Sequence, residues 1–304
     1  MLAIATGIGA QLAMASFLFI SESYIFVAMP RARPVVFYVS IAVLGICGYL
    51  NGYVTSRTMK FFQVHDWKRA ALTSSLIFPM YCLFTLSAAD IVEFIDGAAA
   101  VPFSEGLWHY LLWWAIDAPF AVFGAYRGFL APLGLEPDVS PIKRTIPNMP
   151  WYLKRNVIGL LYGPIIFATI GYEFNYLMDS IWRSYMIYAM FGILLVSLAM
   201  MVVTISSLSI VVTYKLLCHQ NYDWWWSSFH LGASGGAYML IFSLGWLVMN
   251  EDIGFLGADF VYYVTMSLVS GCFGIMCGSI SLLASYLFVE RIYLASSKGQ
   301  FTKF

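Results

Sequence analysis

Long uninterrupted runs of apolar residues constrain this chain more than any other feature. An α-helix needs about 20 apolar residues to cross the hydrocarbon core of a bilayer, where backbone polar groups find no water. The chain is 61% hydrophobic and only 11% charged, an excess that no soluble domain buries. The sequence therefore predicts an all-α polytopic membrane bundle, a single domain over 1–304 with eight transmembrane helices, near 2–29, 35–56, 71–92, 108–129, 157–177, 184–214, 229–249 and 260–293.

The basic residues predict the orientation of the bundle. Most of the 16 lysines and arginines fall in the second, fourth and sixth connections and at the C-terminus, and the exceptions are Arg31, Arg33 and Arg183. The positive-inside rule places these connections in the cytosol, together with both termini. The fourth connection, residues 131–152, contains five prolines, which favour a stiff, extended backbone over a helix.

Several function classes have no support in the residues. A formal net charge of zero gives no indication of a nucleic-acid partner. The five cysteines and four histidines lack the spacing of metal ligands, so we expect no metal and no cofactor. The chain has no catalytic motif known from soluble enzymes. Asp90 and Asp117 lie on consecutive spans, as in an intramembrane aspartyl protease, but without the neighbouring residues of that class, and we expect no enzyme.

Acidic residues inside or near the ends of spans are the candidate polar sites. Asp117 lies about nine residues into the fourth span, near the middle of the bilayer. Two interpretations stay open: a protonated side chain bonded to a neighbouring helix, or a proton or ion site. Glu22, Asp90 and Glu173 lie near lumenal ends of spans, where they form an acidic vestibule or simply extend toward water.

Pairs of glycines four residues apart predict close helix contacts. Small residues at this spacing let two helix backbones approach each other in lipid. The pairs are Gly48 with Gly52, Gly232 with Gly236, and Gly274 with Gly278.

Aromatic residues concentrate at two cytosolic boundaries. Tyr222 and the consecutive Trp224, Trp225 and Trp226 separate two apolar runs, and Trp151 with Tyr152 ends the proline-rich connection. Such side chains bury a ring and keep a polar atom in water, which suits a membrane boundary. We expect both groups to anchor the protein at the interface and to form a recognition surface.

A series of motifs in fixed order resembles the nonaspanins, the nine-transmembrane superfamily of endomembrane proteins. Residues 144–152 are similar to the family pattern Arg-x-Ile-Pro-x-x-Pro-Trp-Tyr, and residues 210–229 resemble a second signature around the tryptophans. Shorter matches extend the resemblance over residues 45 to 293, among them Gly52-Tyr53-Val54, Trp67-Lys68-Arg69, Phe78-Pro79, Ser180-Ile181-Trp182 and Arg291-Ile292-Tyr293.

The resemblance implies a function as well as a fold. Members reside in Golgi or endosomal membranes and sort other transmembrane proteins, so the implied partners are the lipid bilayer, client transmembrane proteins and vesicle-coat subunits. The alternative from the residues is a secondary transporter or channel that uses the intramembrane acids. Two features depart from the family: its large lumenal domain and one further helix have no counterpart before residue 1, and the C-terminus Thr302-Lys303-Phe304 lacks an acidic coat signal.

Overall fold

The computed structural model describes residues 1–26, 33–64, 66–95, 103–132, 147–182, 190–249 and 256–301. The regular elements in these ranges are all helical, as the sequence predicts. They are α1 (Leu2–Phe26), α2 (Arg33–Phe61), α3 (Trp67–Ile95), α4 (Phe103–Leu130), the short 3₁₀ turn η2 (Trp151–Leu153), α5 (Arg155–Ala168), α6 (Gly171–Trp182), α7 (Met190–Cys218), α8 (Trp224–Met249) and α9 (Leu256–Phe301).

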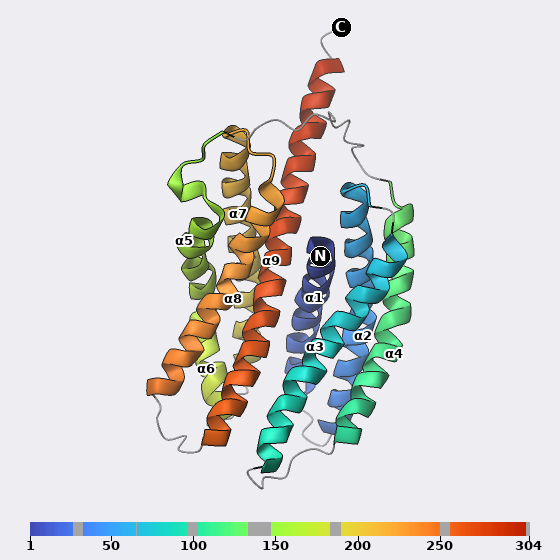
Figure 1. The fold of residues 1–304 in the computed structure, drawn as a ribbon, viewed down its shortest axis with the longest axis vertical. Helices are drawn as coiled ribbons and strands as arrows, with labels where there is room; N and C mark the ends of the chain where they lie inside the picture. The colour runs from blue at the N-terminus through green and yellow to red at the C-terminus, as the bar shows by residue number, and fades with distance from the viewer. Residues whose placement is uncertain are drawn as a thin grey trace.

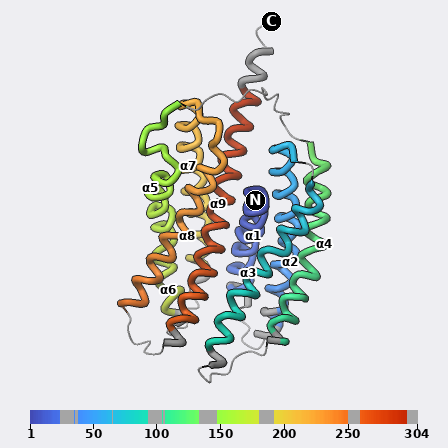
Figure 2. The backbone as a smooth tube through the Cα atoms, in the orientation of Figure 1, coloured from blue at the N-terminus to red at the C-terminus, as the bar shows by residue number. Residues whose placement is uncertain are grey.

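The helices form two groups that meet along α1 and α9. Helices α1 to α4 make up one group and α5 to α9 the other, with α9 packed on α1 and α3 (Figures 1 and 2). Each group has its own apolar core, and α1 contributes to both: Ile8 packs with Phe78 and Trp113, whereas Leu2 belongs to the larger core around α7, α8 and α9. Because α1 lies between the cores, it holds the two groups together.

Length and apolar composition make this a polytopic membrane protein. Among the described residues, six helices are long and apolar enough to cross a bilayer, namely α1, α2, α3, α7, α8 and α9. The pair α5 and α6 together gives a seventh. Helix α4 is long enough to cross a bilayer, but it carries Asp117, Arg127 and several polar aromatic residues and is not one of these apolar helices. The count of eight and the cytosolic placement of both termini stay predictions.

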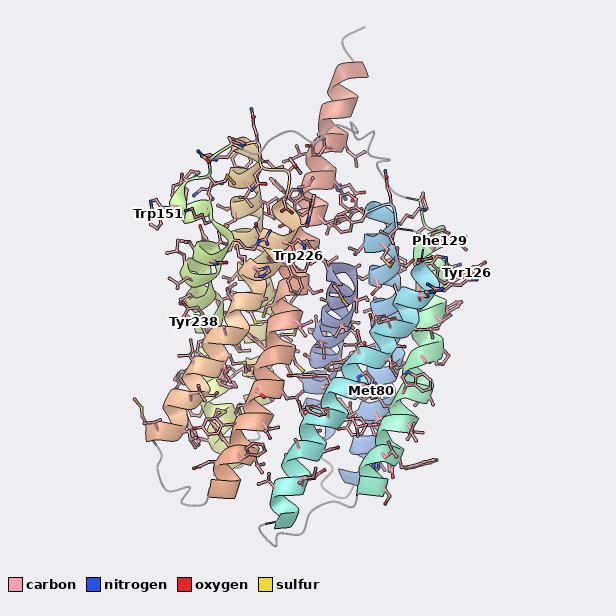
Figure 3. All side chains as sticks on the ribbon, viewed as in Figure 1. Met80, Tyr126, Phe129, Trp151, Trp226 and Tyr238 are labelled. Atoms are coloured by element: carbon pink, nitrogen blue, oxygen red, sulfur yellow. The ribbon has the colours of Figure 1, made fainter. Side chains whose placement is uncertain are left out.

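The predicted span over 157–177 is not a single straight helix. Its two parts, α5 and α6, meet at 62° around Thr169 and Ile170. Within α5, Pro164 has no N–H to donate to the carbonyl of Leu160. The hydroxyl of Tyr238 on α8 donates to that carbonyl instead, over 3.0 Å, and Figure 3 shows Tyr238 beside α5. A neighbouring helix thus satisfies the polar group that the proline frees.

Two similar turns end α2 and α7 at the same end of the bundle. Gln63 and Gln220 both have a φ of 57°, the left-handed conformation that ends a helix. The N–H of each bonds the carbonyl three residues back, and the next N–H bonds the carbonyl five residues back. Both helices therefore end at a defined residue. Just after α2, Phe62 packs edge-on against Trp225 in the first turn of α8.

Some sequence predictions concern residues outside the described ranges. These are most of the proline-rich connection, Arg31, the side chain of Arg33, Arg183 and the last three residues of the chain.

Candidate functional site

A hydrogen-bonded network in the middle of the first helix group contains Asp117. The side-chain amide of Gln11 on α1 donates to Oδ1 of Asp117 over 2.6 Å and to the carbonyl of Leu44 over 3.0 Å. Nδ2 of Asn51 on α2 donates to Oε1 of Gln11 over 3.0 Å, and Thr55 donates to Oδ1 of Asn51. Asp117 is only 1% exposed. The aspartate therefore bonds to a neighbouring helix, and the network joins α1, α2 and α4.

Glycines allow α2 and α4 to pack closely beside this network. A Cβ atom at Gly48 would overlap Oδ1 of Asp117, and one at Gly52 would overlap the carbonyl oxygen of Ala121. A Cβ atom at Gly124 on α4 would likewise overlap the carbonyl oxygen of Tyr49 on α2. Only glycine allows the two backbones this close, and at Gly48 the close approach covers the carboxylate of Asp117.

The other glycine pairs bring α8 and α9 together in the same way. A Cβ atom at Gly232 would lie 2.8 Å from Cα of Gly278. One at Gly236 would lie 2.5 Å from the carbonyl oxygen of Ser270 and 2.7 Å from Cα of Gly274. All three glycine pairs thus face helices of this chain.

A cluster of buried hydroxyls joins α7, α8 and α9. Ser285 contacts Ser209, Thr213 at 2.8 Å and Ser228 at 2.7 Å. Ser281 donates to the carbonyl of Ser228 over 2.6 Å, and its own carbonyl accepts from Ser209 and Ser228. Each of the five side chains is at most 1% exposed. This hydroxyl cluster is the second polar centre of the bundle.

None of the sequence motifs predicts the hydroxyl cluster. The sequence nevertheless contains a pattern that fits it, since Ser209 with Thr213 and Ser281 with Ser285 are spaced by four residues and lie on one face of a helix. Hydroxyl residues are common in apolar helices, where each can bond the carbonyl four residues back. Only the packing of three helices distinguishes these hydroxyls from the many others in the chain.

Replacing Ser285 by alanine is expected to destabilise the bundle by about 1–2 kcal/mol, because it removes the hydroxyl that three others share. The free energy of unfolding in mixed micelles measures this. The control is Ser207→Ala on α7, since the Ser207 side chain is exposed and its hydroxyl bonds the carbonyl of Val203 in its own helix. Equal losses in the two variants would show that the cluster adds nothing to stability.

The three consecutive tryptophans differ in how far they are buried inside the bundle. Trp224 is 5% exposed and belongs to the larger core, whereas Trp225 packs edge-on against Phe62 with ring centroids 5.5 Å apart. Trp226 packs against Phe229 and His230. Of the three, only the latter two retain partial exposure.

The end of the proline-rich connection supplies the more exposed aromatic side chains. Trp151 is 67% exposed and projects outward at the edge of the bundle (Figure 3), with Tyr152 packed edge-on against it. Arg155 pairs with Asp223 at 3.4 Å, which ties this segment to the turn before α8, next to Tyr222. The two predicted aromatic groups therefore lie near each other at one end of the bundle.

The acids predicted near lumenal ends of spans do not gather at a single point in the described part of the chain. Glu22 on α1 is buried and accepts a hydrogen bond from Ser40 over 3.4 Å. Asp90 lies on α3 and Glu173 in the first turn of α6, in the other helix group. Among the described residues, no three His, Cys, Asp or Glu side chains are placed to hold a metal ion.

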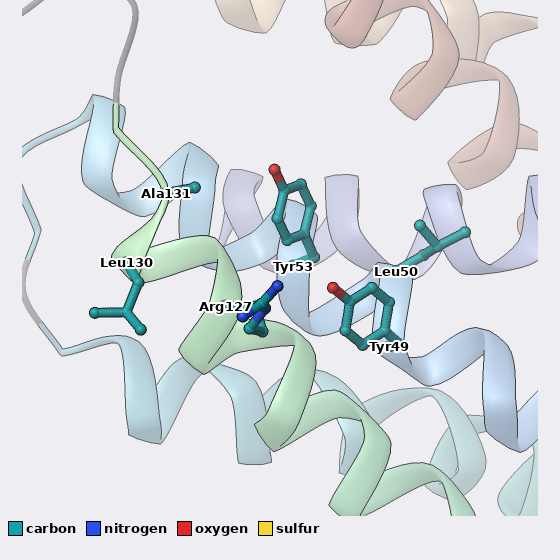
Figure 4. Close-up of a pocket in the computed structure, with 6 residues that line it drawn as sticks. All are labelled: Tyr49, Leu50, Tyr53, Arg127, Leu130 and Ala131. Atoms are coloured by element: carbon teal, nitrogen blue, oxygen red, sulfur yellow. The ribbon is translucent and has the colours of Figure 1, made fainter.

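Cavities open at the same end as the aromatic groups. One of about 480 Å³ lies between α2 and α4 and is lined by Tyr49, Tyr53 and Arg127 (Figure 4). Tyr53 also lines a cavity of about 300 Å³ on the other side of α2, which we call the seam cavity. The seam cavity lies between α2, α8 and α9, and its lining includes Arg57, Trp224, Trp225 and Glu290.

Similarity to known proteins extends over most of the chain. Residues 1–256 match the family described as endomembrane protein 70. The chain belongs to the endomembrane protein 70 family. Transmembrane 9 superfamily member 10 of Arabidopsis thaliana is 30% identical over 250 residues, which cover 81% of this chain and 39% of that protein. Transmembrane 9 superfamily member 4 of Homo sapiens is 29% identical over 283 residues, 89% of this chain and 43% of that protein.

The endomembrane protein 70 relatives confirm the resemblance to the nonaspanins. Transmembrane 9 superfamily member 1 of Saccharomyces cerevisiae is 29% identical over 303 residues, 96% of this chain and 44% of that protein. The chain thus spans less than half the length of these relatives. No solved structure matches it.

Proposed function

We propose that this chain acts in endomembranes of the Golgi or endosomes, where it binds other transmembrane proteins and determines their location. The family description supports the endomembrane location. Because all three glycine pairs pack inside the chain, client helices would dock on an outer surface. Vesicle-coat subunits would be further partners, through segments outside the bundle.

The observation that carries the proposal is a stripe of small and β-branched side chains on the outer face of α7. Val203 and Val211 are 60% and 49% exposed, and Thr204 and Ser207 lie on the same face. Both hydroxyls bond carbonyls of their own helix, so they can face lipid without an unpaired donor. Small side chains inside a span let a second helix approach closely, and hydroxyls can then bond across the interface.

The test measures energy transfer in proteoliposomes between this protein and a single-span helix that carries glycines. Association is expected to exceed that of an all-leucine helix by about tenfold, equivalent to about 1.4 kcal/mol. The double variant Thr204→Leu with Ser207→Leu should lose this preference. The control Phe84→Leu changes another outward-facing position, on α3, where Phe84 is 76% exposed, and should keep the preference for the glycine-bearing helix. Equal association of both helices, or a preference unchanged in the α7 variant, would contradict the proposal.

The second candidate function is a proton-coupled transporter or channel. It is favoured by one observation, the carboxylate of Asp117 bonded to Gln11 inside the membrane. A proton-driven flux through wild-type protein in liposomes that is absent from Asp117→Asn would support it. Equal fluxes through liposomes with and without the protein would exclude it.

A further inference from the structure

The seam cavity carries one positive and one negative side chain that are not paired with each other. Arg57 on α2 and Glu290 on α9 both line it. The ion pair between Arg155 and Asp223 is the only one within 4.0 Å in the described ranges, so Arg57 and Glu290 lie farther apart than that. The guanidinium of Arg57 acts on the hydroxyl of Tyr286, another lining residue, both as a charge and as a hydrogen-bond donor, and the carboxylate of Glu290 acts on the same hydroxyl. A ligand with both a negative and a positive group would match these charges.

The guanidinium of Arg57 is held in place with donors to spare. Its Nη1 donates to the carbonyl of Pro132 over 3.2 Å, and the group lies 6.0 Å from the ring centroid of Tyr53. A guanidinium has five N–H donors, so donors remain available for a further acceptor beside Pro132 and Tyr286. Arginine binds phosphate oxygens especially well because two of its donors match their geometry.

Aromatic rings form much of the remaining wall. Phe62 and Trp225 pack edge-on, as do Trp224 with Trp225 at 6.1 Å and Phe61 with Tyr286 at 5.1 Å. Aromatic walls beside a carboxylate bind quaternary ammonium groups by cation–π attraction. A primary ammonium brings three N–H donors that need acceptors. Glu290 can accept from it, but the ring faces offer only weak acceptors for the remaining donors. The wall therefore favours a choline group over an ethanolamine group.

The ends of two apolar spans place the cavity at the depth of lipid headgroups, and the span of α9 continues past it to Ala295. The apolar span of α2 ends at Phe61 and that of α8 begins at Trp224, and both residues line the cavity. Leu287 of α9, which is 54% exposed, forms an apolar edge. A volume of about 300 Å³ is at the lower limit of small-molecule sites, which suits a headgroup whose acyl chains stay in the bilayer.

The geometry points to a phosphatidylcholine site in the seam cavity. Arg57 binds the phosphate of the lipid, whereas Glu290 and the rings of Trp224 and Trp225 surround the choline. The acyl chains leave past Leu287. The site assignment does not depend on client binding, because it uses α9 with the adjoining ends of α2 and α8 and not the outer face of α7.

The test compares lipid headgroups at constant acyl chains. Purified protein in detergent is titrated with phosphatidylcholine, phosphatidylethanolamine or phosphatidylglycerol, and native mass spectrometry counts the bound lipids. Phosphatidylcholine is expected to bind about tenfold more tightly than either of the others, which corresponds to about 1.4 kcal/mol. Tighter binding of phosphatidylglycerol would overturn the site, because an anionic lipid would use only Arg57. This comparison needs no variant and so does not depend on how well a variant folds.

Variants then locate the binding. Arg57→Gln and Glu290→Gln keep the side-chain size and are each expected to weaken phosphatidylcholine binding about tenfold. Glu290→Gln should weaken phosphatidylglycerol binding less, because it removes only the partner of the choline. The control Arg127→Gln removes a charge from the neighbouring cavity and should leave the affinity for phosphatidylcholine unchanged. Folded variants at positions 57 and 290 that bind phosphatidylcholine like the wild type would exclude the site.

Discussion

Replacement of Gly52 by alanine is expected to separate α2 from α4 and to destabilise the protein by about 3 kcal/mol, the upper end for an overpacked interior. The new methyl group would overlap the carbonyl oxygen of Ala121. A backbone carbonyl in the middle of a helix cannot rotate away, so the whole helix has to move. Thermal unfolding in detergent and the yield of folded protein both measure the loss.

The matched control is Gly245→Ala in α8. Gly245 is also a glycine within an apolar span, but a Cβ atom there meets nothing within 4 Å. Alanine is the better helix former by about 0.5–1 kcal/mol, so this variant should be unchanged or slightly more stable. A Gly52→Ala protein as stable as Gly245→Ala would mean that α2 and α4 are not in close contact.

The sequence predicts the class of fold because lipid leaves few alternatives. Runs of about 20 apolar residues have to be helical, and they are helical here. The break between α5 and α6 could not be predicted in the same way. Pro164 is present in the sequence, but the turn lies at Thr169 and Ile170, and its direction depends on neighbouring helices. Proline in a membrane helix permits a bend without specifying one.

The candidate sites differ in how far the sequence reveals them. Asp117 is conspicuous as a carboxylate within an apolar run, and its predicted depth in the bilayer is enough to make it a candidate polar site. Its partner Gln11 is on a helix that precedes it by 106 residues, and only the packing pairs them. The glycine pairs predict close contacts but not with which helix. For the tryptophans, composition predicts the membrane boundary but not which of the three turns inward, and the rotation of α8 buries Trp224 in the core.

The network around Asp117 yields the second large expected effect. Asp117→Ala is expected to cost about 2–3 kcal/mol, because Gln11 loses its shortest hydrogen bond inside the membrane and a small void remains. Asp117→Asn keeps the size and one acceptor oxygen, so it should cost less than about 1 kcal/mol. Unfolding in mixed micelles, followed by tryptophan fluorescence, measures both. Asp90→Ala on α3 is the control for removing a half-buried carboxylate, with an expected loss below about 0.5 kcal/mol.

A double-mutant cycle separates the contribution of the Asp117–Gln11 hydrogen bond to stability from the cost of the void. If Asp117 and Gln11 stabilise the protein through each other, the combined Gln11→Ala and Asp117→Ala variant should lose about 1 kcal/mol less than the sum of the single losses. Additive losses would mean that the carboxylate contributes nothing through Gln11.

The Asp117→Asn protein also decides between the two interpretations of Asp117, a structural hydrogen bond or a proton site. An isosteric amide preserves the joint between α1, α2 and α4 but carries no titratable proton, so a protein that folds normally and loses only a proton flux would make Asp117 a transport site.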